Sequence, residues 1–121
     1  MYKKGVGLAR SGKFHEAISC FDTLLDKNPD DADVIYCKGL ALCYSGRYLE
    51  AISCFEKTLE KNPRQIDSLR GKAIALYELK RYEESLCYYG KALEIDATDR
   101  DALLGIRVAI NMIGKRARMY Q

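Results

Sequence analysis

The sequence predicts an all-α fold, a solenoid of about seven helices arranged as stacked antiparallel pairs. Three observations support this prediction. The segment Ala17–Phe21 returns unchanged 34 residues later as Ala51–Phe55. The apolar residues between the repeated segments follow helical spacing. Both prolines, Pro29 and Pro63, follow Lys-Asn and close a copy of the repeat, where the residue before proline avoids the α region. A period of this length indicates helical units that bury their apolar faces only by stacking.

The repeat continues well beyond the five-residue segment. Residues 12–29 and 46–63 share eleven identities in eighteen positions, and a looser third copy follows at Arg81–Tyr89. We expect helices over residues 1–11, 14–27, 32–45, 48–61, 66–79, 82–95 and 99–114. The two helices of a pair are expected to join at Ser11-Gly12, Ser45-Gly46 and Lys80-Arg81.

Local signals justify the individual helices. In the third helix Ile35, Gly39, Leu42 and Cys43 recur at i, i+4, i+7 and i+8. In the fourth, Tyr48, Ala51, Ile52, Phe55, Thr58 and Leu59 form a second apolar stripe. Asp30-Asp31 supports a helix start, and residues 98–101 have capping-box spacing, with Thr98 as the cap and Asp101 in the position of Glu.

Composition limits the class of protein. The chain has 121 residues, 48% apolar and 31% charged, which fits one soluble globular domain. A net charge of +3 does not by itself indicate a nucleic acid or membrane partner. No apolar run approaches the ~18 residues of a membrane span, and no secretory signal is visible. Five cysteines at irregular spacings fit neither a disulfide framework nor a zinc site. We therefore expect a cytoplasmic protein.

The period, the helix-turn-helix unit and the residues at its key positions resemble the tetratricopeptide repeat (TPR). The matching residues are Gly5, Leu8, Gly12, Phe14, Ala17, Phe21 and Pro29; Gly39, Leu42, Gly46, Tyr48, Ala51, Phe55 and Pro63; and Ala73, Leu76, Tyr82, Ser85, Tyr89 and Ala92. The resemblance implies a right-handed superhelix in a single domain, residues 1–121. Its parts are repeats over about 1–31, 32–65 and 66–99, a capping helix over about 100–114 and a basic tail over 115–121. Departures are Lys80 for Gly, Ala97 for Pro and Arg107 for a small residue.

In the TPR family the first helix of each repeat lines a concave groove that binds ligands. The resemblance implies that this groove contains Tyr2, Tyr36, Leu40, Cys43, Tyr44, Arg70, Ile74, Tyr77, Leu104 and Val108. We expect the tyrosines at 36, 44 and 77 to anchor a partner and Arg70 to set its direction. The alternative is that these side chains pack on neighbouring first helices.

The aspartates in the first turns of the first helices also have two interpretations. Asp33, Asp67 and Asp101 repeat at one position, where they complement the helix dipole. The alternative is an acidic rim for a basic peptide.

No catalytic, cofactor-binding or metal-binding pattern is present in the sequence. His15 and the pair Glu83-Glu84 are expected to be solvated or repeat features, so we expect no enzymatic activity, no cofactor and no metal. TPR co-chaperones hold acidic chaperone C-termini in a clamp of Lys, Asn and Arg. The corresponding positions here are Tyr2, Val6, Cys37, Asp67 and Gly71 or, one repeat on, Tyr36, Leu40, Gly71, Asp101 and Gly105. They supply no cation, so the sequence argues against that ligand.

The sequence therefore predicts a scaffold that binds a peptide or helix of an unidentified partner protein. It does not indicate a membrane or nucleic acid partner, because the basic residues Lys115, Arg116 and Arg118 suit a helix C-terminus. Two alternatives stay open. The chain could self-associate as a homo-oligomer through its ends or its groove, or it could be a TPR fragment of a larger multidomain protein.

Overall fold

The computed structural model describes residues 2–120. These residues form seven α-helices and no β-strand: α1 (Tyr2–Arg10), α2 (Phe14–Lys27), α3 (Ala32–Tyr44), α4 (Tyr48–Lys61), α5 (Ile66–Glu78), α6 (Tyr82–Ile95) and α7 (Arg100–Met119). The all-α prediction is confirmed. The helix boundaries agree with the predicted ones to within one residue except at the end of α7, and the predicted start at residue 1 lies outside the described residues.

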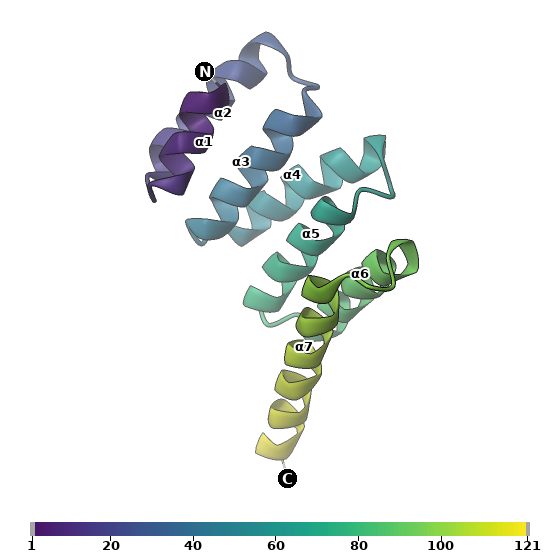
Figure 1. Ribbon diagram of the computed structural model, residues 1–121. Coiled ribbons are helices and arrows are strands. Elements are labelled where there is room, and N and C mark those ends of the chain that lie inside the picture. Colours follow the sequence, from purple (N-terminus) through teal and green to yellow (C-terminus); the bar gives the residue numbers. More distant parts are fainter. Residues whose placement is uncertain (1, 121) are drawn as a thin grey trace. The chain divides into compact units, whose positions relative to one another are not determined.

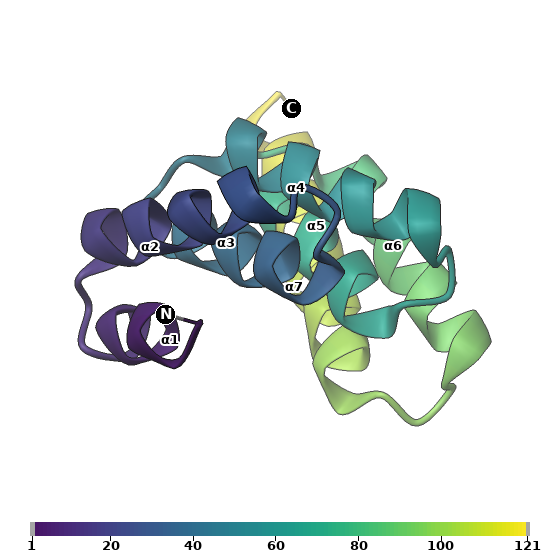
Figure 2. The same cartoon turned by 90° about the horizontal axis from the view of Figure 1, so that it is seen from above.

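The helices belong to two compact units. Unit 1 ends at Pro63 and contains α1–α4, and unit 2 begins at Arg64 and contains α5–α7. Figure 1 shows the helices joined by short turns. In Figure 2, α1 and α2 lie side by side and run in opposite directions. The assignment of a single domain and the right-handed stacking stay predictions.

The three turns inside the helix pairs share one backbone geometry. Gly12, Gly46 and Lys80 occupy the same repeat position and have φ angles of 80°, 85° and 64°. In each turn the next amide closes the preceding helix; Arg81 N, for example, donates to Leu76 O at 2.9 Å. A residue with a Cβ pays a steric cost at positive φ, so Lys80 holds a strained conformation that glycine adopts freely.

An aromatic ring from a second helix packs on a glycine in each unit. A Cβ placed on Gly39 would lie 2.8 Å from a ring carbon of Phe55, and one placed on Gly105 would lie 2.3 Å from the ring of Tyr89. Phe55 is fully buried and Tyr89 is buried as well. At both sites the missing side chain lets the two helices approach, although Gly39 and Gly105 stand at different repeat positions, 66 residues apart.

Helix α7 is longer than predicted. It continues through Gly114 to Met119, so the predicted end of this helix at residue 114 was wrong. Lys, Arg and Ala favour helix formation. In addition, Arg116 forms an ion pair with Glu83 of α6 and lies 6.0 Å from the ring centre of Tyr82. These contacts support the last turns of α7 against α6.

Candidate functional site

The first-helix surface of unit 1, here the α1/α3 face, contains five of the predicted partner-binding residues: Tyr2, Tyr36, Leu40, Cys43 and Tyr44. The Tyr2 hydroxyl lies 3.2 Å from Cys37 Sγ, and this hydrogen bond joins α1 to α3. The bond, followed by partial burial and nearby negative charges, raises the pKa of Tyr2 to about 12. Tyr36, Leu40 and Cys43 are half-buried and pack against the unit 1 core.

Each predicted tyrosine anchor packs against an aromatic ring of a second helix. The pairs and their distances between ring centres are Tyr36 with Phe55 at 5.9 Å, Tyr44 with Phe14 at 5.7 Å, and Tyr77 with Tyr82 at 5.3 Å. Tyr44 nevertheless keeps 70% of its surface exposed. The rings therefore contribute to packing inside their own units, but on second helices and not on the neighbouring first helices that the alternative prediction named. Tyr44 alone of these three is largely accessible.

The corresponding surface of unit 2, here the α5/α7 face, contains Asp67, Arg70, Ile74 and Tyr77 of α5 and Asp101, Leu104 and Val108 of α7. Its aliphatic side chains are accessible: Ile74 is 45% exposed, Leu104 58% and Val108 37%. Exposed apolar side chains that gather on one face usually mark an interaction surface. The two helices that carry these residues are joined through Arg70 of α5, which bonds to Asp101 of α7.

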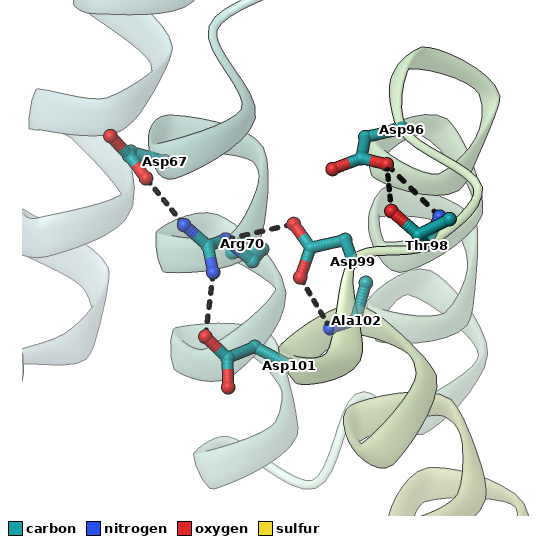
Figure 3. Close-up of polar contacts among 7 residues, drawn as sticks. All are labelled: Asp67, Arg70, Asp96, Thr98, Asp99, Asp101 and Ala102. Carbon is teal, nitrogen blue, oxygen red and sulfur yellow. Dashed lines mark hydrogen bonds and ion pairs between the residues drawn. The ribbon is translucent and has the colours of Figure 1, made fainter.

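Arg70 lies at the centre of an ionic cluster that joins α5 to the start of α7 (Figure 3). Its Nη1 donates to Asp101 at 2.7 Å, and its Nη2 donates to Asp67. Its Nε is buried and makes no hydrogen bond, but lies 3.5 Å from a carboxylate oxygen of Asp99. One guanidinium therefore faces three carboxylates.

The cluster surrounds Arg70, the residue expected to set the direction of a partner, with carboxylates of its own unit. Burial lowers the pKa of Arg70, but the hydrogen bond to Asp67 and the charges of the three carboxylates outweigh burial and leave that pKa raised. The guanidinium stays charged and is neutralised by its own neighbours. Asp101 and Asp67 remain 78% and 56% exposed. The accessible charge of this cluster is therefore negative.

Asp99 is the member of this cluster that the sequence interpretation missed. Its carboxylate accepts from Ala102 N at 3.1 Å, so Asp99 rather than Thr98 caps α7. Thr98 instead donates through its hydroxyl to Asp96 at 2.6 Å, and this contact lowers the pKa of Asp96. The predicted capping box at Thr98 was wrong, although Asp99 lay inside the same motif. The prediction of a cap at Asp30-Asp31 is confirmed, because Asp31 accepts from Val34 N at 3.3 Å.

Two other carboxylates form ion pairs at equivalent repeat positions. Glu84 pairs with Arg81 at 2.7 Å and Glu50 with Arg47 at 2.8 Å, so both are features of the repeat. The described part of the chain contains no group of three His, Cys, Asp or Glu arranged to hold a metal ion. No helix in that part has the length and apolar character needed to cross a membrane.

A surface hollow of about 440 Å³ lies in unit 1 and is lined by residues of α2, α3 and α4, among them Asp22, Lys38 and Lys57. It contains no predicted site residue.

Two sequence models described as tetratricopeptide repeat match the chain, one over residues 30–98 and one over residues 2–42. The chain belongs to the tetratricopeptide repeat family. No curated protein sequence matches it.

Several solved structures share the fold. The first TPR domain of the human RPAP3 protein is 20% identical with a TM-score of 0.89, over 97% of this chain and 92% of that one. The first TPR of Spaghetti (RPAP3), bound to the HSP90 peptide SRMEEVD, is 20% identical with a TM-score of 0.85, over 93% and 91%. The Sgt2 TPR domain from Aspergillus fumigatus is 16% identical with a TM-score of 0.87, over 96% and 78%.

These comparisons do not support the predicted exclusion of an acidic chaperone peptide, because one similar domain holds such a peptide. At this level of identity the likeness shows the fold alone. The exclusion therefore stays a prediction about this chain's own side chains. It rests on the clamp positions, where Cys37 and Asp67 stand in place of polar or cationic groups.

Proposed function

We propose that this protein is an interaction scaffold whose first-helix faces bind a peptide or helix of a partner protein. Membership of a family of interaction modules supports the proposal, as does the fold shared with a TPR domain that was solved with a bound peptide. The proposal assigns no catalytic role and places the protein in the cytoplasm. A micromolar affinity, about −8 kcal/mol, would be ordinary for such a contact.

The observation that carries the proposal is the exposure of Ile74, Leu104 and Val108 on adjacent helices of unit 2. Covering such side chains is favourable by about 25 cal/mol for each Å² of apolar surface removed from water. Tyr44, at 70% exposure, offers a further contact on the α1/α3 face. The other members of that face are held within unit 1, so we expect unit 2 to contribute more of the affinity.

The test is selection of binders to the full chain from a displayed library of short random peptides. The selected peptides are then titrated against Leu104→Ala and Ile110→Ala. Ile110 is the matched control, because it is 55% exposed against 58% for Leu104 and lies six residues along α7, about 120° around the helix. We expect Leu104→Ala to weaken binding at least tenfold and Ile110→Ala to leave it unchanged. Equal effects of the two changes would refute the assignment to this face.

A second function is favoured by a separate observation on α7. Leu103 and Ile110, 49% and 55% exposed, lie away from the α5/α7 face and one heptad apart. Such a stripe suits packing against another helix, so self-association through it is the second candidate. Sedimentation at several concentrations tests it. A mass that falls on dilution, and is monomeric for Ile110→Asp, would favour self-association, whereas a constant monomer mass would exclude it.

A further inference from the structure

The α5/α7 face combines carboxylates with apolar side chains in the same order on both helices. In α5 the order is Asp67, Arg70 and Ile74, and in α7 it is Asp101, Leu104 and Val108. Both sets follow the spacing i, i+3, i+7, which places their members along one side of a helix. The face therefore has an acidic end, at the starts of the two helices, and an apolar end one to two turns further on.

The charge at the acidic end does not cancel. Three carboxylates, those of Asp67, Asp99 and Asp101, surround the single guanidinium of Arg70, so the formal sum is −3 + 1 = −2. The starts of α5 and α7 each contribute about half a positive charge. About one negative charge therefore remains after the helix dipoles are included. It lies on the two accessible carboxylates, because the side chain of Asp99 is only 8% exposed.

The cluster also holds these carboxylates in place. Arg70 bonds to Asp67 on its own helix and to Asp101 on α7, and its side chain is only 23% exposed (Figure 3). The remaining oxygens of Asp67 and Asp101 are therefore presented to solvent by groups whose positions are already set. A preorganised surface loses less conformational entropy when a partner binds.

From this arrangement we propose that the α5/α7 face selects a basic amphipathic segment of a partner protein. Apolar side chains of the segment cover Ile74, Leu104 and Val108, and a Lys or Arg of the segment binds the outer oxygens of Asp67 and Asp101. The inference rests on the proposed function and specifies the chemistry of its ligand. For Asp67 and Asp101 it favours the acidic rim for a basic peptide over a role limited to the helix dipole. The reason is that the dipoles of α5 and α7 offset only part of the negative charge of the cluster.

The distance between the acidic and apolar ends of the face predicts the distance between the basic and apolar residues of the ligand. Asp101 and Val108 are seven residues apart, about 10 Å along the axis of α7 at 1.5 Å per residue. An extended segment that lies along α7 covers this length in about three residues, and a helical segment in about seven. We therefore expect a Lys or Arg three residues from an apolar anchor in extended ligands and seven residues away in helical ones.

The peptide selection described above also tests this inference, because the charge of the selected peptides is an independent result. We expect the selected peptides to carry net positive charge with Lys or Arg at one of these two spacings. Neutral or acidic peptides that still lose affinity with Leu104→Ala would overturn the basic selectivity and leave the proposed function intact. The same selection is repeated on a double variant, Leu104→Asp with Val108→Asp. If the protein enriches no peptides beyond those that this double variant enriches, both the inference and the proposed function are overturned.

Charge variants then locate the selectivity. Asp101→Asn and Asp67→Asn keep the shape of the side chain, and we expect each to weaken a selected basic peptide by up to about fivefold. Glu94→Gln is the matched control, since Glu94 is an exposed carboxylate of α6 in the same unit. Circular dichroism verifies that each variant is folded. If Glu94→Gln weakens peptide binding as much as Asp101→Asn does, the effect comes from the net charge of the protein and not from this face. That result would overturn the inference.

An acidic probe gives the converse measurement. The peptide SRMEEVD, which the similar Spaghetti domain binds, should bind this protein more weakly than the same peptide with Lys in place of both Glu residues. Added salt should reduce this difference, because it screens exposed charges. Tighter binding of the acidic form would overturn the inference.

Discussion

The two first-helix faces occupy the same repeat positions and use them differently. Tyr36, Arg70 and Leu104 are equivalent, each 34 residues from the next. In unit 1 Tyr36 packs on Phe55 and belongs to the core surroundings, whereas in unit 2 Leu104 is 58% exposed. The repeat position therefore determines the direction of a side chain, but its size and its neighbours determine whether it stabilises the fold or remains available to a partner.

The largest difference we predict concerns close packing in unit 2. Gly105→Ala should lower the free energy of unfolding by about 2–3 kcal/mol, because the added methyl group overlaps the buried ring of Tyr89. Gly90→Ala is the control, since nothing lies within 4 Å of its Cβ position and a helical glycine is replaced. It should raise stability by up to about 1 kcal/mol. Thermal unfolding measures both, and similar values for the two variants would contradict the packing of Tyr89 on Gly105.

The next prediction compares the faces directly through stability. Tyr36→Ala should destabilise unit 1 by about 2 kcal/mol, since it removes a half-buried ring and its contact with Phe55. Leu104→Ala should change stability by less than about 0.5 kcal/mol, because the side chain is mostly exposed. Urea unfolding followed by circular dichroism gives both values. If Leu104→Ala lowers the free energy of unfolding as much as Tyr36→Ala does, Leu104 stabilises the fold. The α5/α7 face would then not be a surface available to a partner.

Substitutions in the turns should change stability by a smaller amount, with opposite signs in the two units. Lys80→Gly should raise the stability of unit 2 by about 1 kcal/mol, because glycine adopts a φ of 64° without steric strain. Gly46→Ala should lower the stability of unit 1 by about the same amount, since its φ is 85°. Melting temperatures of the two variants provide the measurement. A loss of stability in Lys80→Gly would mean that the lysine side chain makes a compensating contact.

The last prediction concerns pH dependence. The pKa values of Tyr2 and Tyr89 are both raised to about 12, chiefly by the hydrogen bond to Cys37 for Tyr2 and by burial for Tyr89. The folded protein therefore favours the neutral hydroxyls. This contribution is complete below the unfolded pKa of about 10 and is lost as the pH rises from about 10 to 12. Tyrosinate absorbance in Tyr2→Phe should lack one group titrating near pH 12, and an unchanged curve would contradict the bond to Cys37.

Much of the fold was predictable because its signals are local. Glycine at positions 12 and 46, proline at 29 and 63, and the helical apolar spacing act within a few residues of each boundary. The extension of α7 was not predicted, because its last turn is supported by Arg116 contacting Glu83 and Tyr82, which lie more than thirty residues away in the sequence.

For the candidate site, the residue positions were predictable and their interactions were not. The repeat register placed Ile74, Leu104 and Val108 on first helices, and the structure brings α5 and α7 together. The role of Arg70 depends on Asp99 and Asp101, which approach it only when α7 packs beside α5. A sequence shows that these residues are charged, but not that one cation is surrounded by three anions.

By itself the sequence determined the all-α class, the repeat register and the helix boundaries other than the end of α7, because hydrogen bonding, φ preferences and apolar periodicity act over a single turn or pair of helices. The tertiary structure alone decided which side chains are buried by packing inside the protein and which remain accessible to solvent. It turned Tyr36 inward against Phe55, neutralised Arg70 and left an acidic, apolar surface on unit 2. Burial and net local charge depend on distances between residues far apart in the chain, and only folding sets those distances.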